Sequence, residues 1–312
     1  MKRNFLCWLL CLVIFASCDD KGVEIQKSLS LHSDQVSVTV SSSAAALGQV
    51  FFSDPRFSRD GQVACSTCHQ PNYAYADTVA FSKGVGRRLA VRNTPTLVGL
   101  PDDIPLMWDG GVTPLRHGSQ GILAAVTAQH DMDMNPLDLE RKLSYFPRYR
   151  AALHRLYPHH SLAAGYLLSI RDFVKDIALS SENGIHQSPS ATSKLSLESR
   201  HSIAKGLALF RGKAGCVRCH HGPSMTDGRF YNLALDTVDP GRAAITLLEE
   251  DRGRFRTPPL RMLRKTAPYF HNGSAQSLQI VLQHYINGAG EAGQISLSRA
   301  EQSDLIAYMK TL

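Results

Sequence analysis

Two five-residue motifs constrain this 312-residue chain more than any other feature. They read CSTCH at residues 65–69 and CVRCH at residues 216–220. Two cysteines three positions apart, followed directly by a histidine, are the attachment signature of c-type haem, because the thiols bond to the vinyl groups and the histidine supplies a nitrogen to the iron. A redox dithiol or half of a zinc site is the alternative, but the histidine recurs in both copies. We therefore predict two covalent c-type haems, with His69 and His220 as iron ligands. The attachment residues are Cys65, Cys68, Cys216 and Cys219.

The N-terminal segment is typical of an export signal. Residues 1–17 combine a basic start with an apolar run that is too short to span a bilayer. The ending FASC resembles a bacterial lipobox, so we expect Cys18 to carry a lipid, with plain secretion as the alternative. Each acyl CH₂ buried in lipid contributes about 0.8 kcal/mol, so a multiply acylated cysteine would hold the protein on a membrane. The sequence thus predicts a periplasmic protein, anchored at Cys18.

The two motifs lie in two similar halves of the chain. Residues 18–43 are predicted to be a Ser-rich tether, residues 44–185 an N-terminal haem domain and residues 186–312 a C-terminal haem domain. Each half contains a helical pattern, an aromatic residue, a glycine-containing turn and then the motif, which indicates an internal repeat. No long alternating run predicts a substantial sheet, so the expected fold is mainly α, with two cytochrome-c-like domains. The predicted helices are Pro136–Leu143, Leu162–Leu179, Ile203–Phe210, Leu278–Tyr285 and Ser298–Thr311, with a short helix and turn within residues 44–61.

The net charge of the chain does not by itself exclude a nucleic-acid partner. The formal net charge is +7, which is compatible with nucleic-acid binding. No cluster of Lys and Arg is interleaved with aromatic residues, however, so we expect no nucleic-acid partner. The short basic loop GVGRRLAVR, at residues 84–92, is predicted to be a solvated face or a partner for haem propionates.

Beyond these motifs, the chain resembles bacterial dihaem cytochrome c peroxidases and their relative MauG over nearly all of residues 45–312. The segments that carry the resemblance are LGQVFFSDPRFSRDGQVACSTCH, RNTPTLVG, MWDGG, GCVRCHHGPSMTDGRFYNLAL, DRGRFRTPPLR and TAPYFHNGS. The resemblance implies that hydrogen peroxide reacts at the N-terminal haem and that the C-terminal haem stores or relays electrons. It places a relay tryptophan between the haems at Trp108, for which an aromatic filling a domain interface is the alternative. It also implies a Ca²⁺ ion held by Asn93, Thr266 and Pro268, whose side-chain and backbone oxygens suit this cation.

One departure from the conventional family pattern concerns the C-terminal haem. Conventional members place a methionine ligand 14 residues after the histidine that corresponds to His271, and here that position is Tyr285, as in MauG. An anionic phenolate favours ferric and higher oxidation states, whereas a thioether favours ferrous iron. Tyr285 is therefore the predicted iron ligand. The alternative is that Tyr285 packs in the core while His271 or His284 binds the iron.

A second departure concerns the N-terminal haem. Conventional members cap this haem with a histidine 16 residues after the motif histidine, and here that position is Val85, in a loop without histidine. The first haem is thus expected to be open to peroxide, which again resembles MauG.

Cleavage of the peroxide bond needs a group that moves a proton between the oxygens. The family uses a glutamate, and the register from the Pro136 helix places Asp131 at that position, with Asp133 as the runner-up. Gln120 is a further candidate for the pocket. The alternative is that Asp131 caps the following helix.

These features predict a MauG-like dihaem enzyme that uses hydrogen peroxide to oxidise aromatic residues of an exported partner protein. A conventional peroxidase that takes electrons from a small cytochrome, and an electron carrier without catalysis, are the alternatives. A high-spin signal from an open haem would disfavour the carrier.

Overall fold

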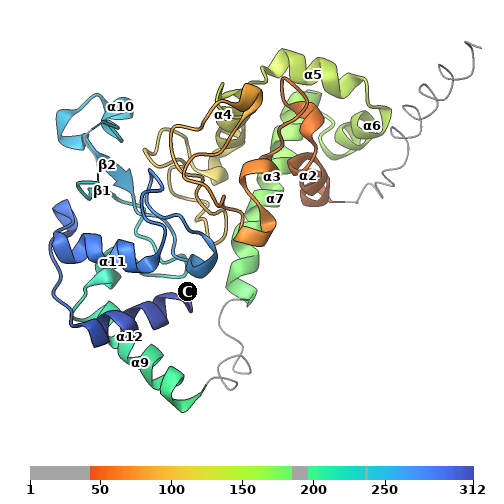
Figure 1. Ribbon diagram of the computed structural model, residues 1–312. Helices are drawn as coiled ribbons and strands as arrows, with labels where there is room; N and C mark the ends of the chain where they lie inside the picture. Colours follow the sequence, from red (N-terminus) through yellow and green to blue (C-terminus); the bar gives the residue numbers. More distant parts are fainter. Residues whose placement is uncertain (1–42, 185–195, 236–237) are drawn as a thin grey trace, which may run out of the picture. The chain divides into compact units, whose positions relative to one another are not determined.

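The computed structural model describes residues 43–184, 196–235 and 238–312 (Figure 1). Residues 42–312 belong to one compact unit. The predicted signal peptide, the Cys18 anchor, nearly all of the tether and the domain boundary at residues 185/186 lie outside the described ranges. Within those ranges, no helix has the length and apolar character that a membrane span requires.

The described residues are mainly helical, as predicted. The only sheet among them is a two-stranded antiparallel pair, in which Tyr231 lies opposite Phe255. The α-helices are α2 (Ala44–Phe52), α3 (Cys65–Cys68), α4 (Gln120–Thr127), α5 (Pro136–Ser144), α6 (Pro147–Leu156), α7 (Leu162–Gly184), α9 (Leu197–Arg211), α10 (Ala243–Thr246), α11 (Leu278–Asn287) and α12 (Arg299–Met309), and the strands are β1 (Phe230–Asn232) and β2 (Arg254–Arg256). Short 3₁₀ helices are η1 (Pro55–Phe57), η2 (Pro71–Tyr73), η3 (Val85–Arg87), η4 (Leu115–His117), η5 (Cys216–Arg218), η6 (Glu249–Asp251), η7 (Leu263–Lys265) and η8 (Gly290–Ala292).

Polar caps set where several helices begin. The Asn135 side chain accepts a hydrogen bond from the Asp138 backbone N–H at the start of α5, and Pro136 occupies the first helical turn, where a missing N–H costs nothing. Asn135 therefore caps α5, and the reading in which Asp131 is the cap of that helix is wrong. At α9, Ser196 accepts from the Ser199 N–H, so this helix begins before the predicted Ile203.

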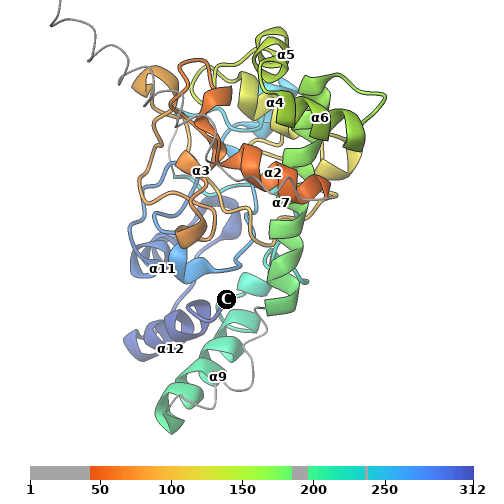
Figure 2. The ribbon, with the colours of Figure 1, turned by 90° about the vertical axis from the view of Figure 1, so that its right-hand side faces the viewer.

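In the first half of the chain, α2 packs along α7 (Figures 1 and 2). The contact is so close that a Cβ on Gly48 would lie 1.9 Å from the carbonyl oxygen of Ser169, so no other residue fits there without a shift of the backbone. Beside it, α2 contributes Phe51 to a cluster with Phe57 and Tyr166, and all three are fully buried. Burial of each such ring contributes about 1.5–3 kcal/mol, which anchors the segment that leads into the first motif.

The second half repeats this construction with α9 and α12, which lie side by side in both views (Figures 1 and 2). A Cβ on Gly206 would lie 2.0 Å from the carbonyl oxygen of Asp304. Phe210, at the end of α9, is buried in a core with Leu282 and Leu305. In both halves, a helix that precedes the haem motif is thus locked against a later helix through a glycine, which agrees with the predicted repeat.

Candidate functional site

The first motif forms one helical turn, α3, and ends at His69. The Ala64 N–H donates to the Thr67 hydroxyl at 3.0 Å, which closes this turn and places both cysteines on the same short segment. The His69 ring nitrogen Nδ1 lies 2.9 Å from the carbonyl oxygen of Tyr75. Because a carbonyl only accepts, Nδ1 carries the proton and Nε2 keeps the lone pair that a metal needs. Burial lowers the pKa of His69, so the imidazole is neutral, as an iron ligand must be.

The second motif has the same proximal arrangement. Gly215, with φ of 65°, turns the chain into η5, and the His220 ring nitrogen Nδ1 lies 3.0 Å from the carbonyl oxygen of Met225. Burial lowers the pKa of His220 as well. Each motif histidine is therefore oriented by a backbone carbonyl a few residues further on, with Nε2 left as the ligand atom.

The four cysteines suit haem attachment better than redox or zinc chemistry. Burial raises the pKa of Cys65 to about 12, of Cys68 to about 11 and of Cys216 to about 11, so these thiols are neutral. Reactive dithiols need the opposite shift. Among the described residues, no group of three or more His, Cys, Asp or Glu side chains is placed to hold a zinc ion.

A buried hydroxyl next to the first motif lacks a hydrogen-bond partner. Tyr166 is fully buried, and its Oη atom has no partner within the described part of the chain. The pKa of Tyr166 is raised by burial and then by the nearby Cys65. Buried hydroxyls are rarely left unpaired, so this atom fits a site that is completed by a bound group. The residues around Cys65 therefore fit a covalently attached haem.

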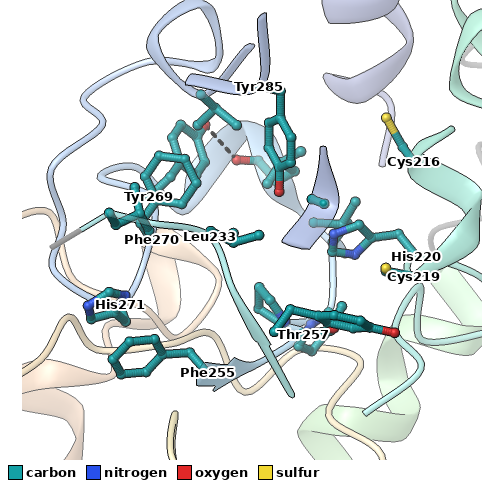
Figure 3. Close-up of a pocket in the computed structure, with 18 of the residues that line it drawn as sticks. Cys216, Cys219, His220, Leu233, Phe255, Thr257, Tyr269, Phe270, His271 and Tyr285 are labelled. Atoms are coloured by element: carbon teal, nitrogen blue, oxygen red, sulfur yellow. Dashed lines mark hydrogen bonds between the residues drawn. The ribbon is translucent and has the colours of Figure 1, made fainter. Parts of the chain in front are cut away.

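The second motif lines a cavity of about 390 Å³ with mainly apolar walls. Cys216, Cys219 and His220 lie on one side of it, and Tyr285 of α11 points its hydroxyl into it, facing the histidine (Figure 3). Burial raises the pKa of Tyr285, so the free phenol is neutral and only a bound metal would release its proton. This arrangement fits a haem held between His220 and the opposite wall.

The two histidines that rivalled Tyr285 are placed differently. His271 lies further along the cavity, stacked on Phe255 with ring centroids 3.5 Å apart and an interplanar angle of 11° (Figure 3). The Nε2 atom of His284 is 2.7 Å from the carbonyl oxygen of Leu233, and His284 is absent from the cavity lining. Of the three side chains, Tyr285 is the one that faces His220.

Trp108 contacts the segment that approaches both motifs. Its indole Nε1–H donates to the carbonyl oxygen of Asn93 at 2.8 Å, and its ring lies edge-on to His271 at 6.4 Å. Pro95, in the same segment as Asn93, lines the second cavity, and its carbonyl also interacts with the His69 ring. Residues 93–96 therefore run from the first iron ligand to the second cavity, with Trp108 packed against them.

The three residues expected to bind calcium all line the second cavity. The Asn93 amide nitrogen donates to the carbonyl oxygens of Val79 at 3.1 Å and Ala80 at 3.3 Å, which turns its Oδ1 atom the other way. The Thr266 hydroxyl donates to the carbonyl oxygen of Leu263, and the ligands expected from Thr266 and Pro268 are their own backbone carbonyl oxygens. The oxygen chemistry agrees with a calcium site, and the prediction stands as one.

The two aspartates that were candidates for proton transfer have different surroundings. The Asp131 carboxyl acts electrostatically on Cys65 and Cys68, and burial raises its pKa, an effect that His130 partly offsets. Asp133 instead binds two arginines through Oδ2, Arg59 at 2.9 Å and Arg88 at 3.1 Å, and these lower its pKa. The Asp131 carboxyl is therefore close enough to act on both cysteines of the first motif, and Asp133 is occupied in ion pairs.

The loop that carries Val85 is attached to the segment that carries Asp131. The Val85 N–H donates to the Asp131 carbonyl oxygen at 2.9 Å, and Arg88 Nη1 donates to the Gln129 carbonyl oxygen at 2.9 Å. A Cβ on Gly84 would lie 1.7 Å from the carbonyl oxygen of His130, so glycine permits this approach. We call Asp133 with its two arginines, Arg59 and Arg88, the clasp.

The sequence did not predict the contacts of Arg88 or the position of Tyr231, and its prediction for Gln120 gains no support from the structure. It treated the basic loop as a solvated face or a propionate partner, whereas Arg88 pairs with Asp133. Gln120 is exposed at the first residue of α4, and no described contact connects it with Asp131, so its place in the peroxide pocket gains no support. Tyr231, which lines the second cavity, was not singled out either.

Comparison with known proteins agrees with this geometry. A family model described as di-haem cytochrome c peroxidase matches residues 42–188. A cytochrome-c peroxidase of Pseudomonas sp. (strain SCT), IdrP2, is 31% identical over 301 residues, covering 85% of this chain and 80% of that protein. The methylamine utilization protein MauG of Methylorubrum extorquens is 31% identical over 280 residues, covering 86% of this chain and 77% of that protein. A solved MauG-like protein associated with microbial copper homeostasis has the same fold, with a TM-score of 0.74, 23% identity, and coverage of 87% of this chain and 89% of that one.

The chain belongs to the di-haem cytochrome c peroxidase family, and it is a dihaem oxidoreductase of the peroxidase type. The predicted resemblance is thereby confirmed, and the family implies two c-type haems. Relatives named MauG and relatives named cytochrome-c peroxidase are similar to this chain to the same degree. Overall similarity therefore does not separate these two kinds of enzyme, and the residues at the two sites must do so.

Proposed function

We propose that this protein is a peroxide-dependent dihaem oxidase of the MauG type, which oxidises aromatic side chains of an exported partner protein. The observation that carries the proposal is Tyr285, whose hydroxyl faces His220 across the second cavity (Figure 3). A phenolate ligand stabilises higher oxidation states of iron, which suits oxidation of a poor reductant such as tryptophan or tyrosine. A methionine at this position would instead favour ferrous iron and suit a high-potential electron store.

The first site would bind and cleave hydrogen peroxide. Haem, when bound there, supplies an iron that exchanges electrons with peroxide. Asp131 would take the proton from one peroxide oxygen and return it to the departing oxygen, because its carboxyl acts electrostatically on both attachment thiols and burial raises its pKa above that of an ordinary aspartate. The loop around Val85 offers no histidine to block the site, and its hydrogen bond to Asp131 holds it in place.

The path between the sites follows the segment that contacts both. Trp108 donates to the Asn93 carbonyl, and Pro95 lies between the His69 ring and the second cavity. We assign Trp108 as the relay for oxidising equivalents. A calcium ion bound by Asn93, Thr266 and Pro268 would hold this segment to the C-terminal half. Export to the periplasm with a lipid at Cys18 would confine the enzyme and its partner to one compartment.

The test compares two reductants for the protein loaded with both haems. Hydrogen peroxide is added together with the exported protein encoded next to this gene, and the product is analysed by mass spectrometry. The proposal expects oxygen insertion or a crosslink at tryptophan or tyrosine. If no residue changes, while a reduced small cytochrome is oxidised at the upper end of ordinary turnover numbers, about 10²–10³ s⁻¹, the conventional peroxidase is the correct reading.

A further inference from the structure

A tyrosine and a carboxylate form a pair at the wall of the second cavity. Tyr231 of β1 lines the cavity, and its hydroxyl donates to Asp227 Oδ2 at 2.8 Å. The other carboxylate oxygen, Oδ1, accepts from the Arg229 backbone N–H at 3.0 Å. One oxygen of Asp227 therefore fixes the turn before β1, and the other is aimed at the phenol.

The same hydroxyl lies at a haem attachment residue. The Cys219 side chain interacts with it, and burial, Asp227 and Cys219 together raise the pKa of Tyr231, so the resting phenol keeps its proton. Attachment of haem converts the Cys219 thiol into a thioether, which has no proton to share. Asp227 then remains as the proton acceptor for Tyr231, next to the sulfur through which the haem is bonded.

A phenol in contact with a base is oxidised much more readily than one without, because loss of the electron makes the hydroxyl a strong acid. The geometry points to Tyr231 as a relay residue that delivers oxidising equivalents from the second haem to the partner protein, with Asp227 as its proton acceptor. The inference rests on the proposed function and adds the place where these equivalents leave the enzyme. Both residues are partly exposed, so an electron can be accepted here from a docked protein.

With both haems in place and oxidised by hydrogen peroxide, Tyr231 would give up one electron to them, and its phenolic proton would move to Asp227, leaving a neutral tyrosyl radical. The radical takes an electron from an aromatic side chain of the partner, and the proton returns from Asp227. Two such rounds supply the two electrons that one peroxide consumes. The two protons released by the partner's aromatic residues complete two water molecules, and the partner gains one crosslink.

The cavity also contains a matched control. Tyr269 lines the same cavity, but its hydroxyl donates to the backbone carbonyl oxygen of Leu263 at 3.0 Å (Figure 3). A carbonyl does not take up a phenolic proton at neutral pH, so Tyr269 lacks the acceptor that would make its oxidation easy. Replacement of either tyrosine by phenylalanine removes one hydroxyl from the same cavity and leaves the ring in place.

The experiment uses the full chain loaded with both haems. Peroxide is added without a partner, the sample is frozen within milliseconds, and the electron paramagnetic resonance spectrum is recorded with natural and ring-deuterated tyrosine. We expect a tyrosyl radical that narrows on deuteration, is lost in Tyr231→Phe and persists in Tyr269→Phe. Asp227→Asn keeps an oxygen for the Arg229 N–H but cannot take the proton, so the radical should form more slowly by about 10²-fold or more. Absorption spectra of each variant check that both haems are attached.

The outcomes separate this inference from the proposed function. Partner oxidation that is equal in the unchanged protein, Tyr231→Phe and Tyr269→Phe overturns the relay and leaves the function intact. A Tyr231-dependent radical in a protein that modifies no partner residue supports the relay and removes the proposed substrate. Absence of any tyrosine radical in the unchanged protein, with partner oxidation unaffected by Tyr231→Phe, also contradicts the inference.

Discussion

The two haem sites share one proximal construction and differ on the opposite face. In both, the motif histidine donates through Nδ1 to a backbone carbonyl, from Tyr75 in the first site and Met225 in the second. Both carbonyls belong to residues in left-handed backbone conformation, with φ of 55° and 54°. Across the second cavity from His220 lies the phenol of Tyr285 (Figure 3), whereas the group whose charge acts on the cysteines of the first motif is the carboxyl of Asp131.

This difference shows which part of a haem site determines its chemistry. The proximal half only has to attach the haem and orient one imidazole, and one local motif suffices for both. The distal half comes from remote segments and decides whether the site activates a substrate or holds oxidising equivalents. In the proposed function, the Asp131 carboxyl would move protons at the first site and the Tyr285 phenol would bind the iron at the second. Each of the following predictions alters one side of that comparison.

The largest effect is expected from Tyr285→Phe. With Tyr285 as the proposed iron ligand, loss of its hydroxyl should abolish the low-spin His/Tyr signal and partner oxidation, while the first site keeps its spectrum. Electron paramagnetic resonance of the ferric protein checks this directly. An unchanged low-spin signal would show that another side chain, such as His271, binds the iron. Tyr269→Phe, in the same cavity, is the control.

Asp131→Asn tests the other distal face. Removal of a general acid–base group should slow the reaction with peroxide by about 10²–10⁴-fold, measured by stopped-flow absorption. Burial raises the pKa of Asp131, and the reaction needs the deprotonated form, so the unchanged protein should lose rate as the pH falls through that raised value. If Asp133→Asn slows the reaction with peroxide this strongly and Asp131→Asn does not, Asp133 is the group that transfers the proton.

Asp131→Asn, which should slow the reaction with peroxide, should also make the folded protein more stable. Because the pKa of Asp131 is higher in the folded than in the unfolded protein, the folded state binds the proton more tightly and loses stability as the pH rises through this window. Asp131→Asn removes that penalty and should raise the melting temperature at neutral pH. A lower melting temperature there would mean that the carboxylate is needed for folding.

Features that are local in the sequence could be predicted, and features that join distant segments could not. Each haem-attachment motif is contained in five consecutive residues, and helix α5 can be predicted from its N-terminal cap and its apolar periodicity. The clasp joins Asp133 to Arg59 and Arg88 across 74 and 45 positions, and no spacing rule connects such residues. The choice of Asp131 over Asp133 likewise depends on which carboxyl these arginines occupy. The Tyr231–Asp227 pair lies four residues apart, but only the fold brings it to Cys219.

The repeated helix contacts predict matched losses of stability in the two halves. Gly48→Ala and Gly206→Ala each place a methyl group within about 2 Å of a backbone carbonyl, with 1.9 Å and 2.0 Å to the nearest oxygen. Overpacking of this kind typically costs about 1–3 kcal/mol. Thermal unfolding of the haem-loaded protein measures it, and Gly61→Ala and Gly222→Ala are controls, since a Cβ at either position meets no atom within 4 Å and only the backbone strain remains. A Gly206→Ala loss no greater than the Gly222→Ala loss would contradict the close α9–α12 contact.

The smallest effect is expected from the clasp, and its pH dependence identifies it. Arg59 and Arg88 lower the pKa of Asp133, so the folded state holds this proton less tightly than the unfolded state does. The stabilisation is therefore present above the ordinary aspartate pKa and is lost as the pH falls through the depressed value. Exposed ion pairs contribute little, so Asp133→Asn should slow the peroxide reaction by less than about tenfold, through looser placement of Asp131.

Hydrogen exchange at the Val85 amide, which bonds to the Asp131 carbonyl, should speed up in Asp133→Asn. It should not speed up in the control Arg87→Gln, which removes a charge from the same loop outside the clasp. The exchange rate of the Val85 amide should become the same in Asp133→Asn and in the unchanged protein at low pH, where Asp133 is protonated. If the two rates still differ there, the effect comes from the left-handed backbone of Asp133, with φ of 48°, and not from its charge.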